Sequence, residues 1–493
     1  MSRIAFDNSY ARLPPRFFAS VEPTAVSAPR LIKLNETLAT ELGLDPAWLS
    51  SPQGVAMLAG NSLVEGAMPI ATAYAGHQFG GFNPQLGDGR AILLGEVVDR
   101  AGRRRDIQLK GAGPTPFSRR GDGRAALGPV LREYIVGEAM AALGIPTTRA
   151  LAAVRTGDWV RRERPLPGAI LTRVAASHIR IGTFQFFAAR GDVEGLRVLA
   201  DHAIARHYPD CAGSEAPYLR LLEAVIAAQA ALVGQWLLIG FIHGVMNTDN
   251  MSIAGETIDY GPCAFMDSYD AGTVFSSIDE HGRYAYGNQS AIARWNLTRL
   301  AEALLPLLAE DVDQAIPIAQ AALDCFEPLF QSGLVAGFRR KLGLATEEPE
   351  DIELIRTLLE TMQRGKADFT LTFRRLGQDS TSPADAEACR DLFENPAEFD
   401  GWESRWRQRL QKEALAAEAE ARRAAMRSVN PLFIPRNHRI EAVIQAAEER
   451  DDLAPFEELL SVLAKPYEEQ PGRESYALPP AAHERVLATF CGT

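Results

Sequence analysis

Alternating and helical patterns of hydrophobic residues divide the chain into a strand-rich part and a long helical part. Residues 1–65 mix Pro-rich turns with short helical patterns. Residues 66–183 carry strand-like runs between Gly-rich turns, namely RAILLGEVVD, RDIQLKGAG and GAILTRVAAS. From about residue 184 the spacing of apolar residues is mainly helical, both over residues 184–345 and over residues 346–493. Strands gathered in one stretch and helices in another predict an α+β fold.

One helix interrupts the predicted strands, over LGPVLREYIVGEAMAALGI at residues 127–145. Its apolar residues form one buried stripe: Val130, Leu131, Tyr134, Ile135, Met140 and Leu143. Two carboxylates of this helix, Glu133 and Glu138, lie about 140° apart around its axis, so only one can face a given neighbour. We choose Glu133 for the inward position, because Val130 and Tyr134 flank it on the inner side.

A second apolar stretch, AVIAAQAALVGQWLLIGFIHGV at residues 224–245, is long enough to suggest a membrane span. It contains Gln229, Gln235 and His243 and lacks basic flanks, so we predict a buried core helix instead. It runs into the polar sequence HGVMNTDNMSIAGETIDYGP. There we expect residues 251–253 and 257–259 to pair as a short hairpin.

Composition and charge narrow the possible partners. The chain has 493 residues, of which 46% are hydrophobic and 23% charged, as in ordinary globular proteins. A net charge of −12 argues against general affinity for nucleic acid or anionic membranes, but it allows a local basic pocket. The N-terminus has no signal-peptide pattern, and the five cysteines include no C-x-x-C pair. We therefore expect a monomeric cytoplasmic protein with reduced thiols.

The segment 243–262 matches the protein-kinase pattern H-R-D-x-x-x-x-N followed by D-F-G. His243 takes the place of the His, Asn250 that of the Asn, and Asp259 that of the metal-binding Asp. The position of the kinase catalytic Asp holds Val245. The sequence thus keeps the residues that would bind a metal ion and lacks the residue that would act as the base.

Candidate phosphate ligands precede this segment. Gly87 and Gly89 lie in a predicted turn followed by Arg90, although a plain β-turn also explains two such glycines. Lys110 ends a strand, as does the kinase Lys that pairs with a helix Glu, here Glu133; a surface Lys and a surface Glu are the alternative.

An Arg-rich loop follows Lys110 and leads into the predicted helix. It contains Asp122 and Gly123 among several arginines, and it is either a second phosphate-contacting loop or simply flexible. Arg173 and Arg180 add positive charge near the junction between the strand-rich and helical parts.

Three long motifs closely resemble the selenoprotein O family of protein-kinase-like adenylyltransferases: YAGHQFGGFNPQLGDGRAILLGE, LKGAGPTPFSRRGDGRAALGPVLREYIVGEAMAALGIPTTRAL and HGVMNTDNMSI with IDYGP. The resemblance is dense over about residues 68–290. It implies a two-lobed kinase-like fold, with an N-lobe at 66–183 and a C-lobe at 184–345. Residues 1–65 would be an N-terminal extension, and residues 346–493 a helical extension packed on the larger lobe.

The resemblance also implies an activity. ATP would bind turned around relative to ordinary kinases, and AMP would pass to a Ser, Thr or Tyr hydroxyl of a protein, the enzyme itself included. UTP is a further possible donor. Two alternatives stay open, namely ordinary γ-phosphoryl transfer and a non-catalytic nucleotide-binding scaffold. Loss of the base at Val245 argues against the first, and retention of a complete metal site argues against the second.

Roles for individual residues follow from the resemblance. Asp249 would be the base, since a turned nucleotide brings the hydroxyl in from another direction, and Asn250 and Asp259 would hold Mg²⁺ or Mn²⁺. Lys110 would contact phosphate and pair with Glu133. The other nucleotide-binding residues would be Gly87, Gly89, Arg90, Asp122, Gly123, Arg173, Arg180 and Asp259.

Some family members pair a C-terminal Cys with another Cys after D-Y-G. Cys491 fits the C-terminal position, but the nearest thiol after Asp259 is Cys263, and the later stretch has Ser276 and Ser277 instead. We therefore do not expect redox control by that disulfide. A free, reactive Cys491 is the alternative.

Overall fold

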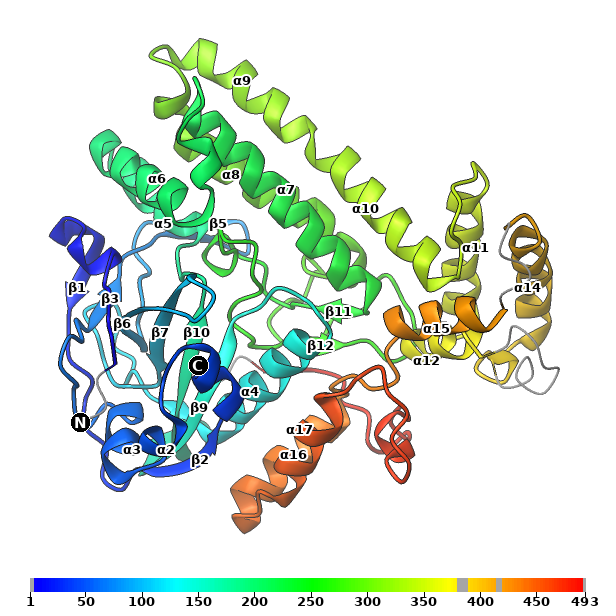
Figure 1. The fold of residues 1–493 in the computed structure, drawn as a ribbon, viewed down its shortest axis with the longest axis horizontal. Helices are drawn as coiled ribbons and strands as arrows, with labels where there is room; N and C mark the ends of the chain where they lie inside the picture. The colour runs from blue at the N-terminus through cyan, green and yellow to red at the C-terminus, as the bar shows by residue number, and fades with distance from the viewer. Residues whose placement is uncertain (1–3, 379–388, 414–418, 491–493) are drawn as a thin grey trace.

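The computed structural model describes residues 4–378, 389–413 and 419–490. Its centre is an eight-stranded antiparallel sheet (Figure 1). In spatial order the main strands are β1 (Phe18–Ser20), β3 (Ile70–Thr72), β6 (Ala91–Val98), β7 (Arg104–Lys110), β10 (Pro165–Ala175), β9 (Arg149–Arg161) and β2 (Arg30–Leu34), and β8 (Ala125–Ala126) pairs with β10. The three strand-like runs read from the sequence are β6, β7 and β10. Both edge strands, β1 and β2, come from residues 1–65.

The sheet is covered on both faces, and strand alternation decides which side chains go where. Ile107 and Leu109 of β7 join a core with α1 (Glu36–Glu41), α2 (Pro46–Leu49) and α3 (Pro52–Leu58). The alternate residues, Gln108 and Lys110, point to the opposite face. That face is packed by α4 (Leu127–Ala142), the helix expected from the apolar stripe.

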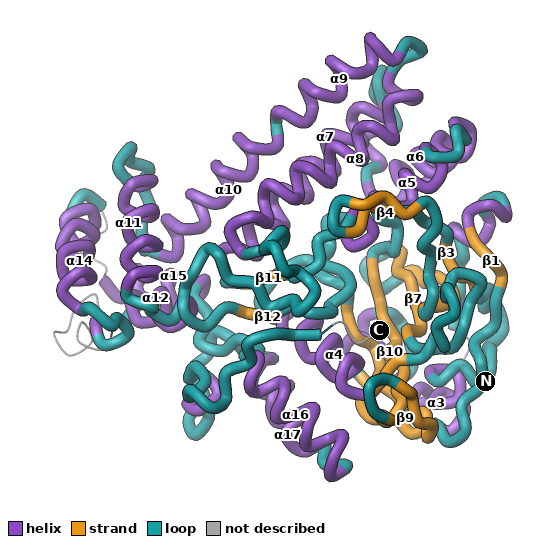
Figure 2. The backbone as a smooth tube through the Cα atoms, turned by 180° about the vertical axis from the view of Figure 1, so that it is seen from behind, coloured by secondary structure: helices purple, strands orange, loops and turns teal. Residues whose placement is uncertain are grey.

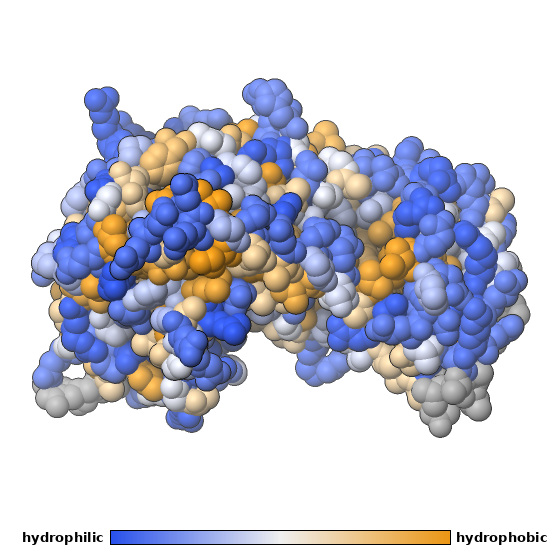
Figure 3. All heavy atoms as spheres, turned by 90° about the horizontal axis from the view of Figure 1, so that it is seen from above, coloured by the Kyte–Doolittle hydropathy of each residue, from blue (hydrophilic) through white to orange (hydrophobic). Residues whose placement is uncertain are grey.

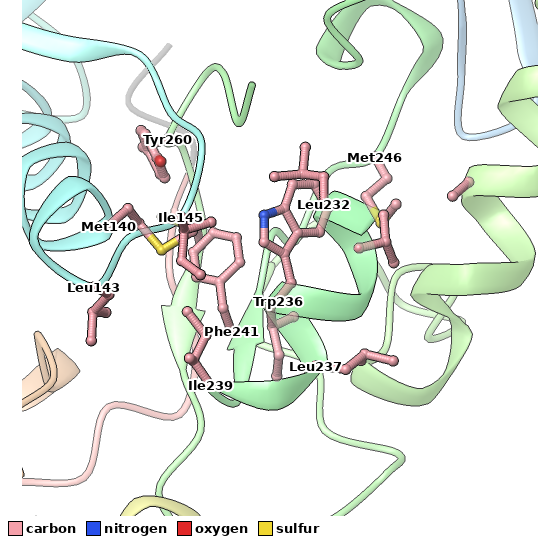
Figure 4. Packing of buried hydrophobic residues seen from close by; sticks show 14 of the residues in the cluster. Met140, Leu143, Ile145, Leu232, Trp236, Leu237, Ile239, Phe241, Met246 and Tyr260 are labelled. Carbon is pink, nitrogen blue, oxygen red and sulfur yellow. The ribbon is translucent and has the colours of Figure 1, made fainter. Parts of the chain in front are cut away.

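The helical part contains α5 (Ile181–Ala188), α6 (Val193–His207), α7 (Pro217–Leu238), α8 (Gln289–Leu308), α9 (Val312–Asp324) and α10 (Phe326–Lys341). Among the described residues one helix, α7, is long and apolar enough to cross a membrane. It is mostly buried and packs against α8 and α10, as expected of a core helix. Figure 4 shows Trp236 near its end beside Phe241, where α7 meets the residues after α4.

The segment after α7 departs from one prediction. Phe241–Ile242 (β11) pairs with Ala264–Phe265 (β12), but the hairpin expected between residues 251–253 and 257–259 is wrong. Ser252 instead bridges to Arg180, and Thr257 bridges to Thr147. Both sides of the turn therefore find partners in distant segments, which a local turn pattern does not reveal.

The C-terminal helices are α11 (Asp351–Arg364), α12 (Phe369–Leu376), α14 (Pro396–Leu410), α15 (Ala419–Val429), α16 (Asn437–Arg450) and α17 (Ala454–Leu463). In Figure 1, α11 and α14 lie far from the sheet, whereas α16 and α17 lie beside α4. The C-terminal extension therefore also braces the strand-rich part. Figure 3 shows one face of the molecule, on which hydrophilic residues dominate and hydrophobic ones form small patches.

Candidate active site

A cleft of about 450 Å³ lies where the ends of β6 and β7 face the segment 245–262. Apart from Glu133, every residue proposed from the sequence as a ligand or base lines it: Gly87, Gly89, Arg90, Lys110, Asp122, Gly123, Arg173, Arg180, Asp249, Asn250 and Asp259. Glu133 lies behind the wall and bonds to Lys110. The structure thus gathers residues that are up to 172 positions apart in the sequence.

The cleft is cationic although the protein is acidic overall. Seven basic side chains line it: Arg90, Lys110, Arg119, Arg124, Arg162, Arg173 and Arg180. Four carboxylates line it as well, namely Asp88, Asp122, Asp249 and Asp259. An excess of positive charge in a partly enclosed site attracts anions, so the cleft suits a polyphosphate.

Strand register places Lys110 and Arg173 on the same face of the sheet. In the β7–β10 pair, Lys110 lies opposite Leu171 and Arg173 lies opposite Gln108, so both basic side chains point toward α4. There Glu133 accepts a hydrogen bond from Lys110 Nζ and another from Arg173 Nε. Burial alone would raise the pKa of Glu133, but Arg173 and Lys110 hold it below its ordinary value.

The two carboxylates of α4, Glu133 and Glu138, have different partners. Glu138 turns away from Lys110 and accepts from Arg149 Nη2 at 2.8 Å. Of the two α4 carboxylates, Glu133 is therefore the one that bonds to Lys110, and its role in the site stays a prediction.

Asp259 stands at the centre of the cationic wall. Its Oδ1 accepts from Arg173 Nη2 at 2.6 Å, and its Oδ2 accepts from Arg180 Nη1 at 3.1 Å. Burial acts to raise the pKa of Asp259, but Arg173, Arg180 and Lys110 outweigh it and hold the pKa well below its ordinary value. Asp259 also has φ +59, in the left-handed region that few residues other than glycine adopt. Such strain is common where a side chain must be aimed at a functional site.

Asp249 lies on a short 3-10 turn, Thr248–Asn250, and its side chain is almost fully buried. Its Oδ2 accepts from Gln78 Nε2 at 3.1 Å, and its main-chain oxygen accepts from Arg180 Nη1 at 2.9 Å. Its Oδ1 is buried without a hydrogen-bond partner. Burial raises the pKa of Asp249 to about 6. A buried carboxylate oxygen without a protein partner is costly, so this oxygen is a candidate contact for a cation or a substrate.

The oxygens at this end of the cleft fit a hard divalent cation. Asn250 Nδ2 donates to the Val245 carbonyl at 2.9 Å, which leaves the amide oxygen for a cation. Asp259 supplies an ionised carboxylate, and Asp249 Oδ1 lacks a partner. Within the described part of the chain, no group of three His, Cys, Asp or Glu side chains is arranged to hold a metal ion. The coordination shell would therefore need Asn250 and further oxygens, such as those of phosphates.

The glycines of the cleft cannot be replaced without movement. A Cβ on Gly87 would lie 2.3 Å from the Phe117 ring, and one on Gly123 would lie 2.1 Å from the Gly113 backbone. Both have positive φ, +74 and +66.

Asp122 bonds to Arg162 Nη1 at 2.9 Å, so its carboxylate anchors the Arg-rich loop. Sequence reasoning missed Arg162, because nothing local connects it to position 122.

Sequence reasoning also missed a small hairpin formed by β4 (Gly76–Gln78) and β5 (Gly81–Asn83). It lies against α5 beside the main sheet (Figure 2). Besides the Gln78 bond, His77 N donates to Thr248 Oγ1 at 2.7 Å, and Phe79 N donates to Asn247 Oδ1 at 3.1 Å. Strands of three residues are too short for a periodic pattern, although the paired glycines of GHQFGGF are a turn signal.

His243 and the cysteines have structural surroundings. His243 Nε2 lies 2.9 Å from the Ile258 carbonyl, and burial lowers its pKa, so it joins two segments of the site as a neutral ring. Cys263 is a free buried thiol whose pKa burial raises to about 12. Ser276 lies beside Thr489 of the C-terminal segment, and Cys491 lies outside the described residues.

Comparison with known proteins gives one consistent result. The sequence model described as "Protein adenylyltransferase SelO" matches residues 1–464. Proteins named "Protein nucleotidyltransferase YdiU" are 68% identical in Bradyrhizobium sp. (strain ORS 278) and 65% identical in Rhodopseudomonas palustris (strain BisB5), each over 488 residues. The relative of that name from Methylorubrum extorquens (strain PA1) is 67% identical over 494 residues. Each alignment covers 99% of both chains.

Proposed function

Because the chain belongs to the SelO family and is a nucleotidyltransferase, we propose that it transfers AMP from ATP to Ser, Thr or Tyr hydroxyls of proteins. One observation carries the proposal. An apolar residue, Val245, lines the cleft where a protein kinase has its catalytic base, and Asp249 presents a buried, unpartnered oxygen four residues later. The base has changed position, which fits an acceptor that approaches from a new direction.

The proposal includes a kinase-like fold with reversed ATP. The Lys110–Glu133 bond between a strand and a helix supports it, since kinases hold nucleotide phosphates with such a pair. Residues 66–183 would form the N-lobe, completed by β1 and β2, and residues 184–345 the C-lobe. The basic residues deep in the cleft would bind the outer phosphates, leaving the α-phosphate near Asp249.

In the proposed reaction the acceptor oxygen attacks the α-phosphorus. The bond from that phosphorus to the oxygen bridging to the β-phosphate breaks, and pyrophosphate leaves. Asp249 orients the hydroxyl and takes its proton, while Lys110 and Arg173 neutralise charge on the departing pyrophosphate. A divalent ion held by Asn250 and Asp259, Mg²⁺ or Mn²⁺, supplies further charge neutralisation when bound.

The decisive experiment compares ATP labelled at the α-phosphate with ATP labelled at the γ-phosphate. With Mg²⁺ or Mn²⁺ present, we expect protein to acquire label only from the α-phosphate, and the enzyme's own band reports self-modification. Label from the γ-phosphate alone would establish an ordinary kinase, and label from neither would favour a scaffold. α-Labelled UTP in parallel tests whether UMP is also transferred.

Three variants test the roles of individual residues. Asp259→Ala should abolish metal-dependent transfer, and Asp249→Ala should reduce turnover far more than ATP affinity. Val245→Asp restores a carboxylate at the kinase position, but with ATP reversed it should not produce γ-phosphoryl transfer. If Val245→Asp does transfer the γ-phosphate, the nucleotide lies in the ordinary orientation.

The cytoplasmic, monomeric state that we also propose can be checked by fractionation and by light scattering.

A further inference from the structure

A second hollow, of about 650 Å³, adjoins the cleft. Phe79 and Ile278 line both spaces, so the two adjoin at these side chains. The remaining lining residues come from the loop at 279–283 and from the start of α8: Asp279, Glu280, His281, Arg283, Asn288, Ala291 and Ile292. We call this space the acceptor groove. Phe79 and Ile278 therefore mark the boundary between the groove and the cleft.

Phe79 occupies a position that its residue type disfavours. The β4–β5 register pairs Gln78 with Gly81, so Phe79 and Gly80 form a two-residue turn in which both have positive φ, +50 and +85. Such turns normally hold Asn, Asp or Gly. Phe79 is nevertheless 39% exposed. A large apolar side chain kept in a strained, exposed position beside a functional cleft indicates contact with a ligand.

The surroundings hold Phe79 rigidly in place. Its N–H donates to Asn247 Oδ1 at 3.1 Å and to the Tyr284 hydroxyl oxygen at 3.2 Å. The Tyr284 ring meets the Phe79 ring edge-on, with centroids 5.1 Å apart. Asp279 accepts from the backbone N–H of Tyr284 at 2.7 Å and so fixes that residue. The preceding residue, Gln78, bonds to Asp249, so the hairpin that carries Phe79 also contacts the proposed base.

Charge separates the groove from the nucleotide cleft. Two carboxylates, Asp279 and Glu280, line the groove with a single arginine, Arg283. The Arg283 guanidinium lies over the Trp295 ring, 4.8 Å from its centroid. This balance disfavours a polyphosphate and favours a neutral, partly apolar ligand.

We propose that the acceptor groove binds an extended segment of the protein substrate. An apolar side chain next to the acceptor hydroxyl lies between Phe79 and Ile278, and the hydroxyl reaches Asp249 in the cleft. This inference rests on the proposed transfer to protein hydroxyls and adds a substrate class, namely sites flanked by a large apolar residue. The acidic lining of the groove, and the wall that it shares with the cleft at Phe79 and Ile278, support this occupant over the nucleotide.

The test uses Phe79→Gly, which removes the ring and relieves the positive φ, so folding should not suffer. Two synthetic peptides with one Ser, flanked by Leu or by Asp, serve as acceptors for α-labelled ATP. We expect the Leu peptide to be preferred by the wild type, and Phe79→Gly to raise its KM about tenfold. The ATP Kd should stay unchanged. The control is Phe82→Ala, which removes an exposed ring of the same hairpin that lines neither space.

Unchanged KM in Phe79→Gly, or equal use of the two peptides by the wild type, would overturn the inference. A weakened ATP Kd in Phe79→Gly would also overturn it and assign the groove to the nucleotide. Failure of the proposed function looks different, because the wild type then labels no peptide at all. In that case fluorescence anisotropy of the labelled Leu peptide tests whether the groove binds a peptide. Loss of peptide binding in Phe79→Gly, with binding kept in Phe82→Ala, supports peptide binding in the groove. Any other pattern refutes it.

Discussion

Replacing Glu133 by Gln should lower the free energy of unfolding by about 3–5 kcal/mol, because it breaks a buried ion pair from one side. The Glu133 side chain is 4% exposed and holds Lys110 and Arg173, which are 9% and 5% exposed. Glutamine keeps the shape but removes the charge between two cations. Arg173 retains its bond to Asp259. Lys110 loses the carboxylate of Glu133 and still faces the positive charges of Arg173 and Arg90.

The assay is urea unfolding of single and double variants. Lys110→Met alone should be tolerated better, at roughly 1–2 kcal/mol, because Glu133 keeps its bond to Arg173. Adding Lys110→Met to Glu133→Gln should then recover part of the loss, since it removes the unpaired cation. Glu138→Gln on the same helix is the control. Its pair with Arg149 is 16% and 28% exposed, so we expect a loss of only about 1 kcal/mol.

Two results would refute this reasoning. If Glu133→Gln unfolds at the same urea concentration as Glu138→Gln, solvent already screens the pair. If Lys110→Met lowers the stability of Glu133→Gln further, Lys110 stabilises the fold through other contacts. Either result would remove the electrostatic basis assigned to the back wall of the cleft.

Three further predictions concern other parts of the molecule. Burial raises the pKa of Glu256 from 4.5 to about 7, so the stability contributed by its protonated form is present at low pH and is lost as pH rises through 7. Glu256→Gln should therefore stabilise the protein against urea at pH 8 and change its stability little at pH 4.5. An equal change in stability at the two pH values would disprove this prediction. Gly87→Ala should weaken ATP binding at least about tenfold, as measured by calorimetry. Gly102 also has a positive φ but has open space around it, so Gly102→Ala should cost only about 1 kcal/mol of stability and leave ATP binding intact. Trp402→Ala should lower the unfolding free energy by about 3–5 kcal/mol yet spare ATP binding, since Trp402 is buried among the C-terminal helices; loss of binding by the folded variant would link those helices to the cleft.

Local patterns were sufficient for those parts of the site that lie on long regular elements. The alternation in RDIQLK places Gln108 and Lys110 opposite Ile107 and Leu109, and the period of α4 selects Glu133 over Glu138. Strand and helix periods are geometric consequences of the backbone, so they survive in any tertiary context. The core helix α7 was predictable from its long apolar run, although the run at 224–245 continues past the helix end at Leu238 into β11.

Contacts between short, distant segments were not predictable in this way. The turn at 254–256 has good hairpin residues, yet Ser252 pairs with Arg180 and Thr257 pairs with Thr147. Arg162 meets Asp122 across forty residues, and Gln78 meets Asp249 across a still longer separation. Each contact depends on how whole elements pack, which no local pattern encodes. The roles assigned to the site residues stay predictions.

The segment 245–250 shows how the proposed base can lie at position 249 while the proposed metal ligand Asn250 keeps its orientation. Asn250 is oriented through its bond to the carbonyl of Val245, a main-chain atom that any residue provides. The orientation of Asn250 therefore does not depend on which side chain stands at position 245. Asp249 is oriented separately, by Gln78 from the β4–β5 hairpin and by Arg180, whose guanidinium also holds Asp259. The proposed base at position 249 thus depends on a hairpin outside this segment, and that same hairpin carries Phe79, which lines the proposed acceptor groove.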